Sequence, residues 1–469
     1  MKRRTFLQGL GMLGLGITAG RSFAELSFDS ANVRFNPVSA ASLPRYINIF
    51  LYGGPSELAG NLTNIPDISA NSQNPYPASV LGNVTANGFW GNAGGNIMEA
   101  LLASGDMSIY RTMNRIKEDS KAHGLSVTQN LVGNLNMQSP GIATTLAWIM
   151  SQNNPFTKPV EELLFPFVSF EGESSVFKSG ELYIDSVLKP VALIPNLGTL
   201  TSRSPYARSQ NVGSGILNDD PLNDLDIHSR LDTLANHTNS GNDLLKLNDS
   251  FGKRALYDQT IKDKLDVNVV DATISSYGLD PATLYLNNNF GNRMKAAVSL
   301  ALANPETVFI SMGSGGLGGW DDHSQAITNY ANRMSNLMQA IQAGITHMNA
   351  ASANGVNHAG NIIINVYGDF GRNVNLNDSL GWDHGNNQNL YTFGGKGISG
   401  RSLGKIVGRT ERIGNSGVNR QFTTPTATSY QFEPFALAST MYRHFGVTNP
   451  ELITGELPIN ESAPAEPLV

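Results

Sequence analysis

Two short segments of the chain each place an aspartate directly before a histidine, in surroundings rich in glycine. The first segment, GGWDDHSQ, covers residues 318–325 and supplies Asp321, Asp322 and His323. The second segment, SLGWDHGNN, supplies Asp383 and His384. Imidazole nitrogens and carboxylate oxygens are ligands for zinc and manganese, and carboxylate oxygens also bind calcium. The residue types therefore indicate a metal or anion site, provided that the fold brings both segments together.

A third segment, DFGRN, follows an apolar run and adds Asp369 and Arg372. The chain contains no cysteine, which excludes disulfides, thiolate metal ligands and cysteine nucleophiles. Histidine, aspartate and glutamate are therefore the strong metal ligands that remain. Several other histidines have no carboxylates arranged around them, and we expect structural roles for them: His228, His237, His347, His358 and His444.

A simpler interpretation explains the same residues. Asp322 or Ser324 can cap the helix expected after residue 325, because aspartate and serine are favoured at helix N-termini. Asp369 can initiate a turn. A metal site and a hydrogen-bonded network of histidine and aspartate at a capped helix start are both open interpretations of the sequence.

The surrounding elements predict where these segments lie. ETVFISMG (306–313) predicts a strand, and apolar residues spaced three and four apart from Ile327 to Met348 predict an amphipathic helix. The run NIIINVYGDFGRN (361–373) predicts a strand buried on both faces, as in a parallel sheet. Ligands of such sheets lie beyond the carboxyl ends of the strands. We therefore expect the segment 318–325 and Asp369 at one end of the sheet.

The first half of the chain predicts further strands at 46–54 and 107–114, and in PFVSFEGE and ELYIDSVL. Between residues 204 and 265 the composition changes to segments rich in Asn, Asp and Ser with short helical patterns. We interpret this stretch as a helical cap insertion covering one face of the domain. The expected fold class is therefore α/β with a mostly parallel central sheet and a helical insertion.

The N-terminus and the charge limit the compartment and the partners. MKRRTFLQ followed by a short, glycine-rich apolar run predicts a twin-arginine export signal over residues 1–24, cleaved after Ala24. The run is too short for a stable membrane span, so we expect a periplasmic or extracellular protein. The net charge of −6, without a cluster of Lys or Arg in the mature chain, argues against nucleic acid as a partner.

The motifs together resemble a family of exported bacterial proteins known as domain of unknown function fifteen-oh-one, which is assigned to the alkaline phosphatase and sulfatase superfamily. Members carry blocks GGPSHLDT, GGWDTH, EFGR and GRDHW, and the counterparts here are YGGPSELAG, GGWDDHSQ, DFGRN and GWDHGNN. A further block resembles AHGLSVTQNLVG and selects His123 and Gly133. The resemblance covers roughly residues 45 to 460.

This resemblance implies an alkaline-phosphatase-like three-layer sandwich that binds one or two divalent metals, zinc, manganese or calcium. It implies metal-ligand roles for Asp321, His323, Asp369 and His384, a catalytic role for His123, and Arg372 as partner of a substrate oxyanion. Further candidates for the site are Asp322, Asp383, Glu57 and Ser120.

The sequence also departs from the family blocks. Glu57 stands where the family has His, and Ala59 stands where it has Asp. The block that selects His123 offers an imidazole where superfamily enzymes place a hydroxyl nucleophile, and Ser120 lies three residues too early.

Two functional hypotheses follow. The first is an exported, metal-dependent hydrolase of phosphate or sulfate esters, acting on a small anionic ester. The second is a non-catalytic exported protein that uses a phosphatase-like scaffold to bind a partner at the cell envelope.

Overall fold

The computed structural model describes residues 30–55, 74–118, 121–172, 174–178, 191–193, 260, 263–413 and 421–466. Several sequence-based predictions lie outside the described residues: the export signal over 1–24, Glu57, Ser120, the strand predicted in ELYIDSVL, and nearly all of the cap insertion 204–265.

The centre of the fold is a mostly parallel sheet with strand order β10-β2-β9-β6-β1-β5-β3-β4. Among the described strands of this sheet, only β9 runs antiparallel to its neighbours, which are β2 and β6. The bounds are β1 Arg45–Leu51, β2 Met107–Asn114, β3 Phe167–Ser169, β4 Val191–Leu193, β5 Phe309–Gly313, β6 Ile362–Gly368, β9 Asn387–Gly394 and β10 Ile406–Val407. The mixed α/β class and the mostly parallel sheet predicted from the sequence are thereby confirmed.

The sheet separates two hydrophobic cores. In the central strand β1, Ile47, Ile49 and Leu51 pack into one core. Tyr46 and Phe50 of the same strand pack into the other core. Successive side chains of a strand point to opposite faces, so a strand covered on both faces must be apolar at nearly every position. This requirement explains the unbroken apolar runs of β1 and β6.

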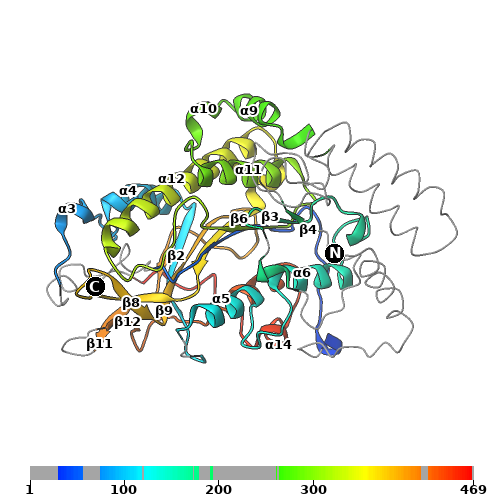
Figure 1. The fold of residues 1–469 in the computed structure, drawn as a ribbon. Helices are drawn as coiled ribbons and strands as arrows, with labels where there is room; N and C mark the ends of the chain where they lie inside the picture. The colour runs from blue at the N-terminus through cyan, green and yellow to red at the C-terminus, as the bar shows by residue number, and fades with distance from the viewer. Residues whose placement is uncertain are drawn as a thin grey trace, which may run out of the picture.

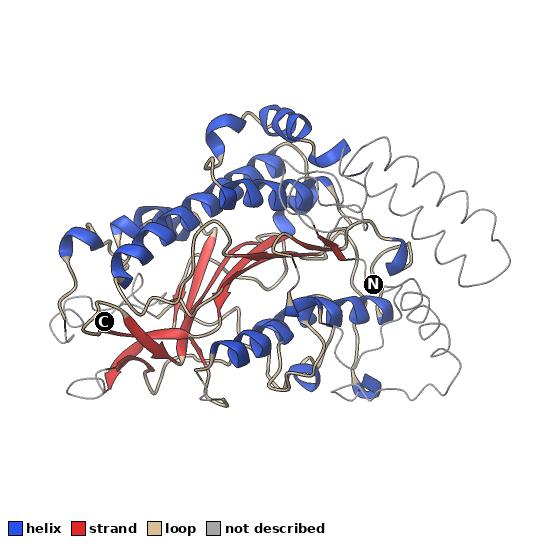
Figure 2. Cartoon of the chain, in the orientation of Figure 1, coloured by secondary structure: helices blue, strands red, loops and turns tan. Residues whose placement is uncertain are grey.

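Helices cover both faces of the sheet and make it the middle of three layers (Figures 1 and 2). On one face lie α3 Ala78–Leu81, α4 Gly95–Ala103, α9 Val267–Ser276, α10 Pro281–Leu284, α11 Asn289–Ala303 and α12 Ala326–Ala353. On the other face lie α5 His123–Val132, α6 Ile142–Gln152, α13 Ala436–His444 and α14 Glu451–Thr454. Short 3-10 helices cover Ser30–Asn32, Gly91–Ala93, Val160–Glu162, Ser175–Phe177 and Asn357–Asn361.

The predicted strand, helix and strand of the second half are present as β5, α12 and β6, with β1 between the two strands. The predicted single strand over 361–373 is wrong in one respect, because the chain leaves the sheet at Asp369. It continues as β7 Gly371–Leu376, which pairs with β8 Trp382–Gly385 in a separate antiparallel hairpin. Gly371 permits this change of direction, since any Cβ there would overlap the carbonyl of Asn387. A second small sheet pairs β11 Thr410–Ile413 with β12 Gln421–Pro425.

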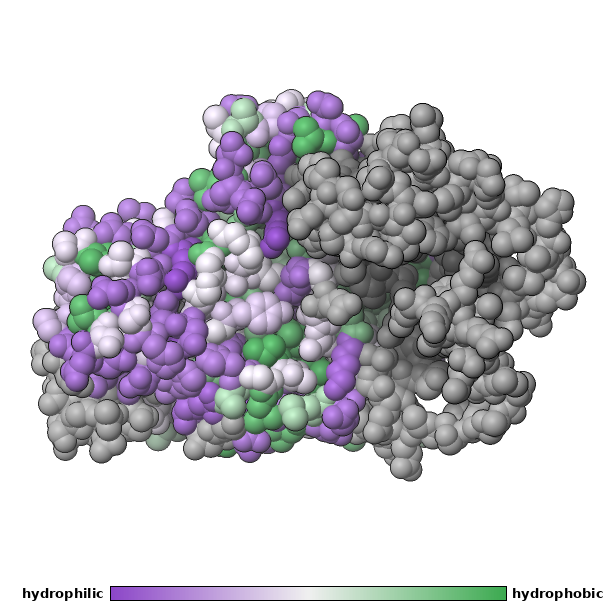
Figure 3. Space-filling view, viewed as in Figure 1, coloured by the Kyte–Doolittle hydropathy of each residue, from purple (hydrophilic) through white to green (hydrophobic). Residues whose placement is uncertain are grey.

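The surface seen in Figure 3 is mostly hydrophilic, with apolar residues in small groups. Within the part of the chain that the structure describes, every helix is too short or too polar to cross a bilayer.

Candidate metal centre

The candidate site forms at the carboxyl ends of three neighbouring strands. Gly53 and Gly54 follow β1, Asp321 follows β5 by way of a glycine-rich loop, and Asp369 follows β6. The predicted position of the segment 318–325 and Asp369 at one end of the sheet is therefore confirmed. The site also receives residues from outside the sheet, because His123 begins α5 and His384 lies on β8.

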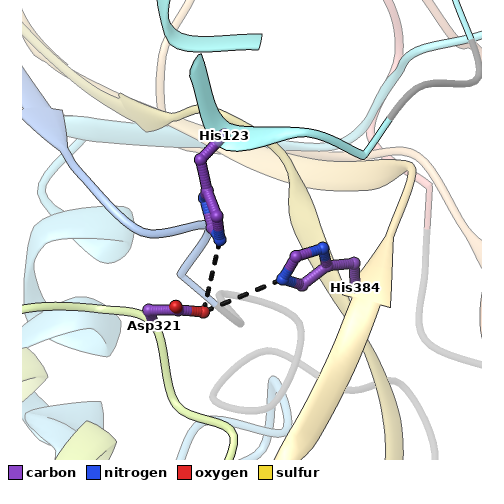
Figure 4. Close-up of side chains that lie close together, drawn as sticks. All are labelled: His123, Asp321 and His384. Atoms are coloured by element: carbon purple, nitrogen blue, oxygen red, sulfur yellow. Dashed lines mark ion pairs between the residues drawn. The ribbon is translucent and has the colours of Figure 1, made fainter. Parts of the chain in front are cut away.

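One oxygen atom of Asp321 lies at the centre of the site. Its Oδ1 is 3.4 Å from His123 Nε2 and 3.8 Å from His384 Nε2 (Figure 4). These three ligand atoms all lie within 4.8 Å of one another. The fold thus gathers an aspartate and two histidines that are distant in the sequence, in a spacing that suits a single cation.

The two imidazoles are oriented by hydrogen bonds through their other ring nitrogen. His384 Nδ1 is 2.9 Å from the carbonyl oxygen of Lys121, and His123 Nδ1 is 2.6 Å from Asp369 Oδ2. A carbonyl or a carboxylate can only accept, so both Nδ1 atoms carry a proton, and in the neutral imidazoles both Nε2 atoms present a lone pair to the centre. Metal-binding histidines are commonly held in this way by an outer carboxylate or carbonyl.

The pKa values of the site follow from these contacts. The hydrogen bond to Asp369 raises the pKa of His123, against the effect of burial. Burial and the positive charge of Arg372 lower the pKa of His384. Burial by itself would raise the pKa of Asp321, but the hydrogen bond and charge of Arg372 outweigh it and lower that pKa. Asp321 is therefore ionised at neutral pH, as a metal ligand must be.

The donor set fits zinc. Zinc binds imidazole nitrogen and carboxylate oxygen at about 2.0–2.2 Å, and ligand atoms arranged tetrahedrally at that distance lie roughly 3.3–3.6 Å apart. The separations of 3.4 and 3.8 Å from Asp321 Oδ1 are close to this range. Calcium prefers a shell of six or more oxygens, and the two imidazoles disfavour it. Three protein ligands with one position open is the pattern of catalytic zinc sites.

His323 lies beside this set, and its geometry differs from the predicted ligand role. Its Nε2 is 3.3 Å from Arg372 Nη1, 3.2 Å from Asp321 Oδ1 and 3.0 Å from His384 Nε2. If Nε2 accepts the guanidinium proton, its single lone pair is used and cannot also bind a metal. Two unprotonated nitrogens 3.0 Å apart then repel each other unless a cation lies beside them. A cation at the centre, or a proton on one of the two Nε2 atoms, would relieve this contact.

Asp369 has partners that differ from those of a metal ligand. Its side chain is fully buried, Oδ2 binds His123, and Oδ1 accepts the N–H groups of Gly53 and Gly54. Both oxygens are therefore engaged with the protein. The direct-ligand role of Asp369 that the family resemblance implies therefore stays a prediction.

Arg372 is likewise fully buried, in contrast to the predicted partner of a substrate oxyanion. Its Nε donates to the Gly54 carbonyl at 2.6 Å, and Nη1 donates to the Trp382 carbonyl at 2.9 Å and faces His323. Its Nη2 donates to the Gly53 carbonyl and to Asp321 Oδ1. A guanidinium has five N–H groups, and these five acceptors use all of them. The oxyanion contact of Arg372 therefore stays a prediction.

The helix-capping interpretation of the segment 318–325 is wrong. Asp322 is buried and paired with Arg333 at 2.6 Å, on the inner side of the loop. The N-terminus of α12 has no side-chain cap. Instead, the backbone N–H groups of Gln325 and Ala326 donate to the carbonyls of Ser379 and Leu380 in the turn between β7 and β8. The hairpin turn therefore supplies the acceptors that cap the N-terminus of α12, and it holds His323 at the site.

Close backbone approaches hold the site together. A Cβ on Gly53 would lie 2.5 Å from the Asp321 nitrogen, and a Cβ on Gly381 would overlap the backbone of His323. The loops that carry the aspartate and the hairpin are packed so closely that only glycine fits at these positions. Asp383, another candidate, is half exposed and reaches His323 Nδ1 only at 3.8 Å.

The sequence did not reveal the buried residues behind His123. Asn130 lies seven positions further along α5, on the same face of the helix. Its Nδ2 donates to the carbonyls of Gly368 and Asp369 at 2.9 and 2.8 Å. Its Oδ1 in turn accepts from the buried Arg115 at 2.9 Å. The seven-residue step from His123 along one helix face is the signal that could have identified Asn130.

One prediction about the remaining histidines is wrong. His444 has a carboxylate beside it, because its Nε2 is 2.9 Å from Glu461 and its Nδ1 is 2.6 Å from the hydroxyl of Tyr46. The two residues are separated by 17 positions and a turn, so the pattern around His444 alone gave no indication of the pair. His444 ends α13, which packs on the face of the sheet opposite to α12.

The fold and the site together define a three-layer α/β protein with a histidine and carboxylate centre at its strand ends. The model of the family described as "Protein of unknown function (DUF1501)" matches residues 44–448, and the chain belongs to that family. The resemblance stated from the sequence motifs is thereby confirmed at the level of the family.

No curated protein matches the chain. Among solved structures, the chain is similar to BT4656 in complex with its substrate D-glucosamine-2-N,6-O-disulfate, at 11% identity and a TM-score of 0.27. The alignment covers 89% of this chain and 81% of that one. At this TM-score the likeness carries no argument about fold or function.

Proposed function

We propose that the protein is an exported, metal-dependent hydrolase of small phosphate or sulfate esters, built on an alkaline-phosphatase-like scaffold. The observation that carries the proposal is the convergence of His123 Nε2, Asp321 Oδ1 and His384 Nε2 at the carboxyl ends of parallel strands. Export through the predicted signal over 1–24, and a periplasmic or extracellular location, belong to the same proposal.

The three residues would hold one zinc or manganese ion. When bound, such an ion supplies a positive charge that polarises the ester and lowers the pKa of a water molecule. The protein contributes the orientation of its ligands. Asp369 and the Lys121 carbonyl hold both imidazoles with Nε2 toward the centre, so little rearrangement is needed when the ion binds.

The charges of the site favour a cation. Asp321, Asp369 and Asp383 carry three negative charges, and Arg372 carries one positive charge within the same group of contacts. Neutral imidazoles leave this group net negative. A divalent ion would compensate that charge and would attract an anionic ester to the open coordination position.

The test is metal content together with hydrolysis. The mature protein should be isolated from the exported fraction without chelators and without a metal-binding tag, and then analysed for zinc, manganese and calcium. We expect roughly one equivalent of zinc or manganese per chain, and turnover of 4-nitrophenyl phosphate or sulfate that chelators abolish. The variant Asp321→Ala should lose both properties, whereas His358→Gln should keep them, because the His358 imidazole binds the Leu302 carbonyl at the end of α11 and not the centre. Wild-type protein that is folded and free of metal would contradict the proposal.

A second candidate is a protein that holds the metal and binds an envelope partner without turnover. One observation favours it, namely that Arg372 has all five of its N–H groups engaged and offers none to an ester oxygen. The same experiment separates the two candidates. Bound metal with no hydrolysis of any aryl ester would favour the binding protein.

A further inference from the structure

We propose that Asp369 and Arg372 are positioning residues, which fix His123 and Asp321 respectively and contact neither the metal nor the ester. This inference rests on the proposed function, because it concerns how the ligands of that metal are held. It assigns new roles to both charged residues of the DFGR segment that leads from β6 into β7.

Arg372 uses all five of its N–H donors in contacts within the protein. Its guanidinium is fully buried, and its N–H groups go to Gly53, Gly54, Trp382, His323 and Asp321. Three of these acceptors are backbone carbonyls, two from the loop after β1 and one from β8. Arg372 therefore ties three segments together and presents Asp321 to the centre. An ester oxygen could reach it only by replacing one of these buried bonds, which would leave a buried polar group without its partner.

Asp369 determines which ring nitrogen of His123 carries the proton. Because Oδ1 accepts two backbone N–H groups and Oδ2 accepts the Nδ1 proton, the carboxylate cannot turn to face the centre without abandoning three donors. With the proton on Nδ1, the neutral His123 ring has a free lone pair on Nε2. Asp369 thus makes the metal-binding form of His123 the stable one before any metal arrives.

A single substitution can reverse this tautomer. In Asp369→Asn the two N–H groups of Gly53 and Gly54 require the amide oxygen, so the NH2 group must face His123. An NH2 group only donates, so Nδ1 would become the acceptor and the proton would move to Nε2. His123 would then present an N–H, and not a lone pair, to the centre.

The first experiment reads the tautomer in metal-free protein by nitrogen-15 NMR of the His123 ring. We expect protonated Nδ1 in the wild type and protonated Nε2 in Asp369→Asn. The matched control is Asp383→Asn, which changes an exposed aspartate 3.8 Å from His323 and should leave the His123 tautomer unchanged. The same tautomer in wild type and Asp369→Asn would overturn the role assigned to Asp369. This measurement needs no metal, so it decides the inference even if the proposed function fails.

The second experiment separates positioning from anion binding at Arg372. Zinc affinity is measured by competition with a chelator, and inorganic phosphate is then titrated into zinc-loaded protein as the anion probe. Positioning predicts that Arg372→Lys weakens zinc binding by about 10–100-fold and changes the phosphate affinity of the loaded protein by less than about twofold. Unchanged zinc affinity with a large loss of phosphate affinity would overturn the inference and restore the oxyanion role. Thermal unfolding of each variant shows that it is folded, and Arg372→Gln serves as a second variant of similar length.

If wild-type protein binds no zinc, the proposed function fails, and the inference is then judged by the tautomer alone. If the wild type binds zinc and Arg372→Lys binds it equally well, the proposed function stands and the inference about Arg372 fails.

Discussion

The imidazole of His123 and the carboxylate of Asp369 form a hydrogen bond of 2.6 Å across 246 residues of sequence. His123 begins helix α5, and Asp369 directly follows strand β6 of the central sheet. Asn130 of the same helix binds the backbone carbonyl of Asp369, so helix α5 contacts this strand end twice. The position of His123 is therefore set by a rigid contact between two layers, which is what a preformed ligand requires.

The first prediction concerns His123 as a metal ligand. His123→Ala should weaken zinc binding by at least about 100-fold, more than the loss typical of an outer-shell substitution, because it removes a nitrogen that lies 3.4 Å from the central oxygen. Chelator competition measures the effect. His358→Ala is the control, since its imidazole lies away from the site and binds the Leu302 carbonyl at 2.8 Å. Equal zinc affinities for the two variants would remove His123 from the ligand set.

The second prediction concerns the close contact between the hairpin and the loop that carries His323. In Gly381→Ala the new methyl group would overlap the His323 backbone, so the hairpin must move away from the start of α12. We expect a loss of about 1–3 kcal/mol in unfolding free energy, together with weaker zinc binding. Gly319→Ala, in the loop that carries His323, is the control, because a Cβ there meets no atom within 4 Å. A well-folded Gly381→Ala protein with wild-type zinc affinity would show that this contact does not shape the site.

Local sequence patterns predicted the elements that position the site but not the contacts within it. The apolar run of β6 and the three- and four-residue spacing of α12 are local signals, and they placed Asp321 and Asp369 at one sheet end. The roles of Asp369 and Arg372 depend instead on which backbone groups lie opposite them. Gly53, Gly54 and Trp382 occupy those positions only after three segments have packed. Such pairings cannot be recognised from the spacing of residues in the sequence, and neither can the pair of His444 with Glu461.

The third prediction concerns Asn130 behind the site. Asn130→Ala removes two hydrogen bonds to the carbonyls of Gly368 and Asp369 and should lower the unfolding free energy by about 1–3 kcal/mol. It should also weaken zinc binding, because α5 would no longer hold its register against the strand end. Asn134→Ala is the control, since Asn134 follows the same helix and donates to the Ile453 carbonyl at 2.7 Å, away from the site. If both variants lose stability and both retain full zinc affinity, Asn130 acts on the fold alone.

The last prediction concerns stability in acid and a carboxylate far from the candidate centre. Glu461 is 7% exposed and contacts Arg401 at 2.9 Å, Arg443 at 3.1 Å and His444 at 2.9 Å. Burial alone would raise the pKa of Glu461, but the hydrogen bond to His444 and the positive charges of His444, Arg401 and Arg443 outweigh burial. They lower this pKa from its ordinary value of 4.5 to about 2 in the folded protein.

Because the folded pKa is below the unfolded one, the ionised carboxylate stabilises the fold above pH 4.5, and this contribution disappears as the pH falls toward about 2. The difference in pKa corresponds to about 3 kcal/mol. Denaturant unfolding of the wild type between pH 6 and pH 2.5 should therefore show a decline that is smaller in Glu461→Gln, which has no proton to gain at this position. The variant should be less stable than the wild type at pH 6, and the gap should narrow in acid. A constant gap across this range would mean that Glu461 has the same pKa folded and unfolded, contrary to its buried contacts with three basic side chains.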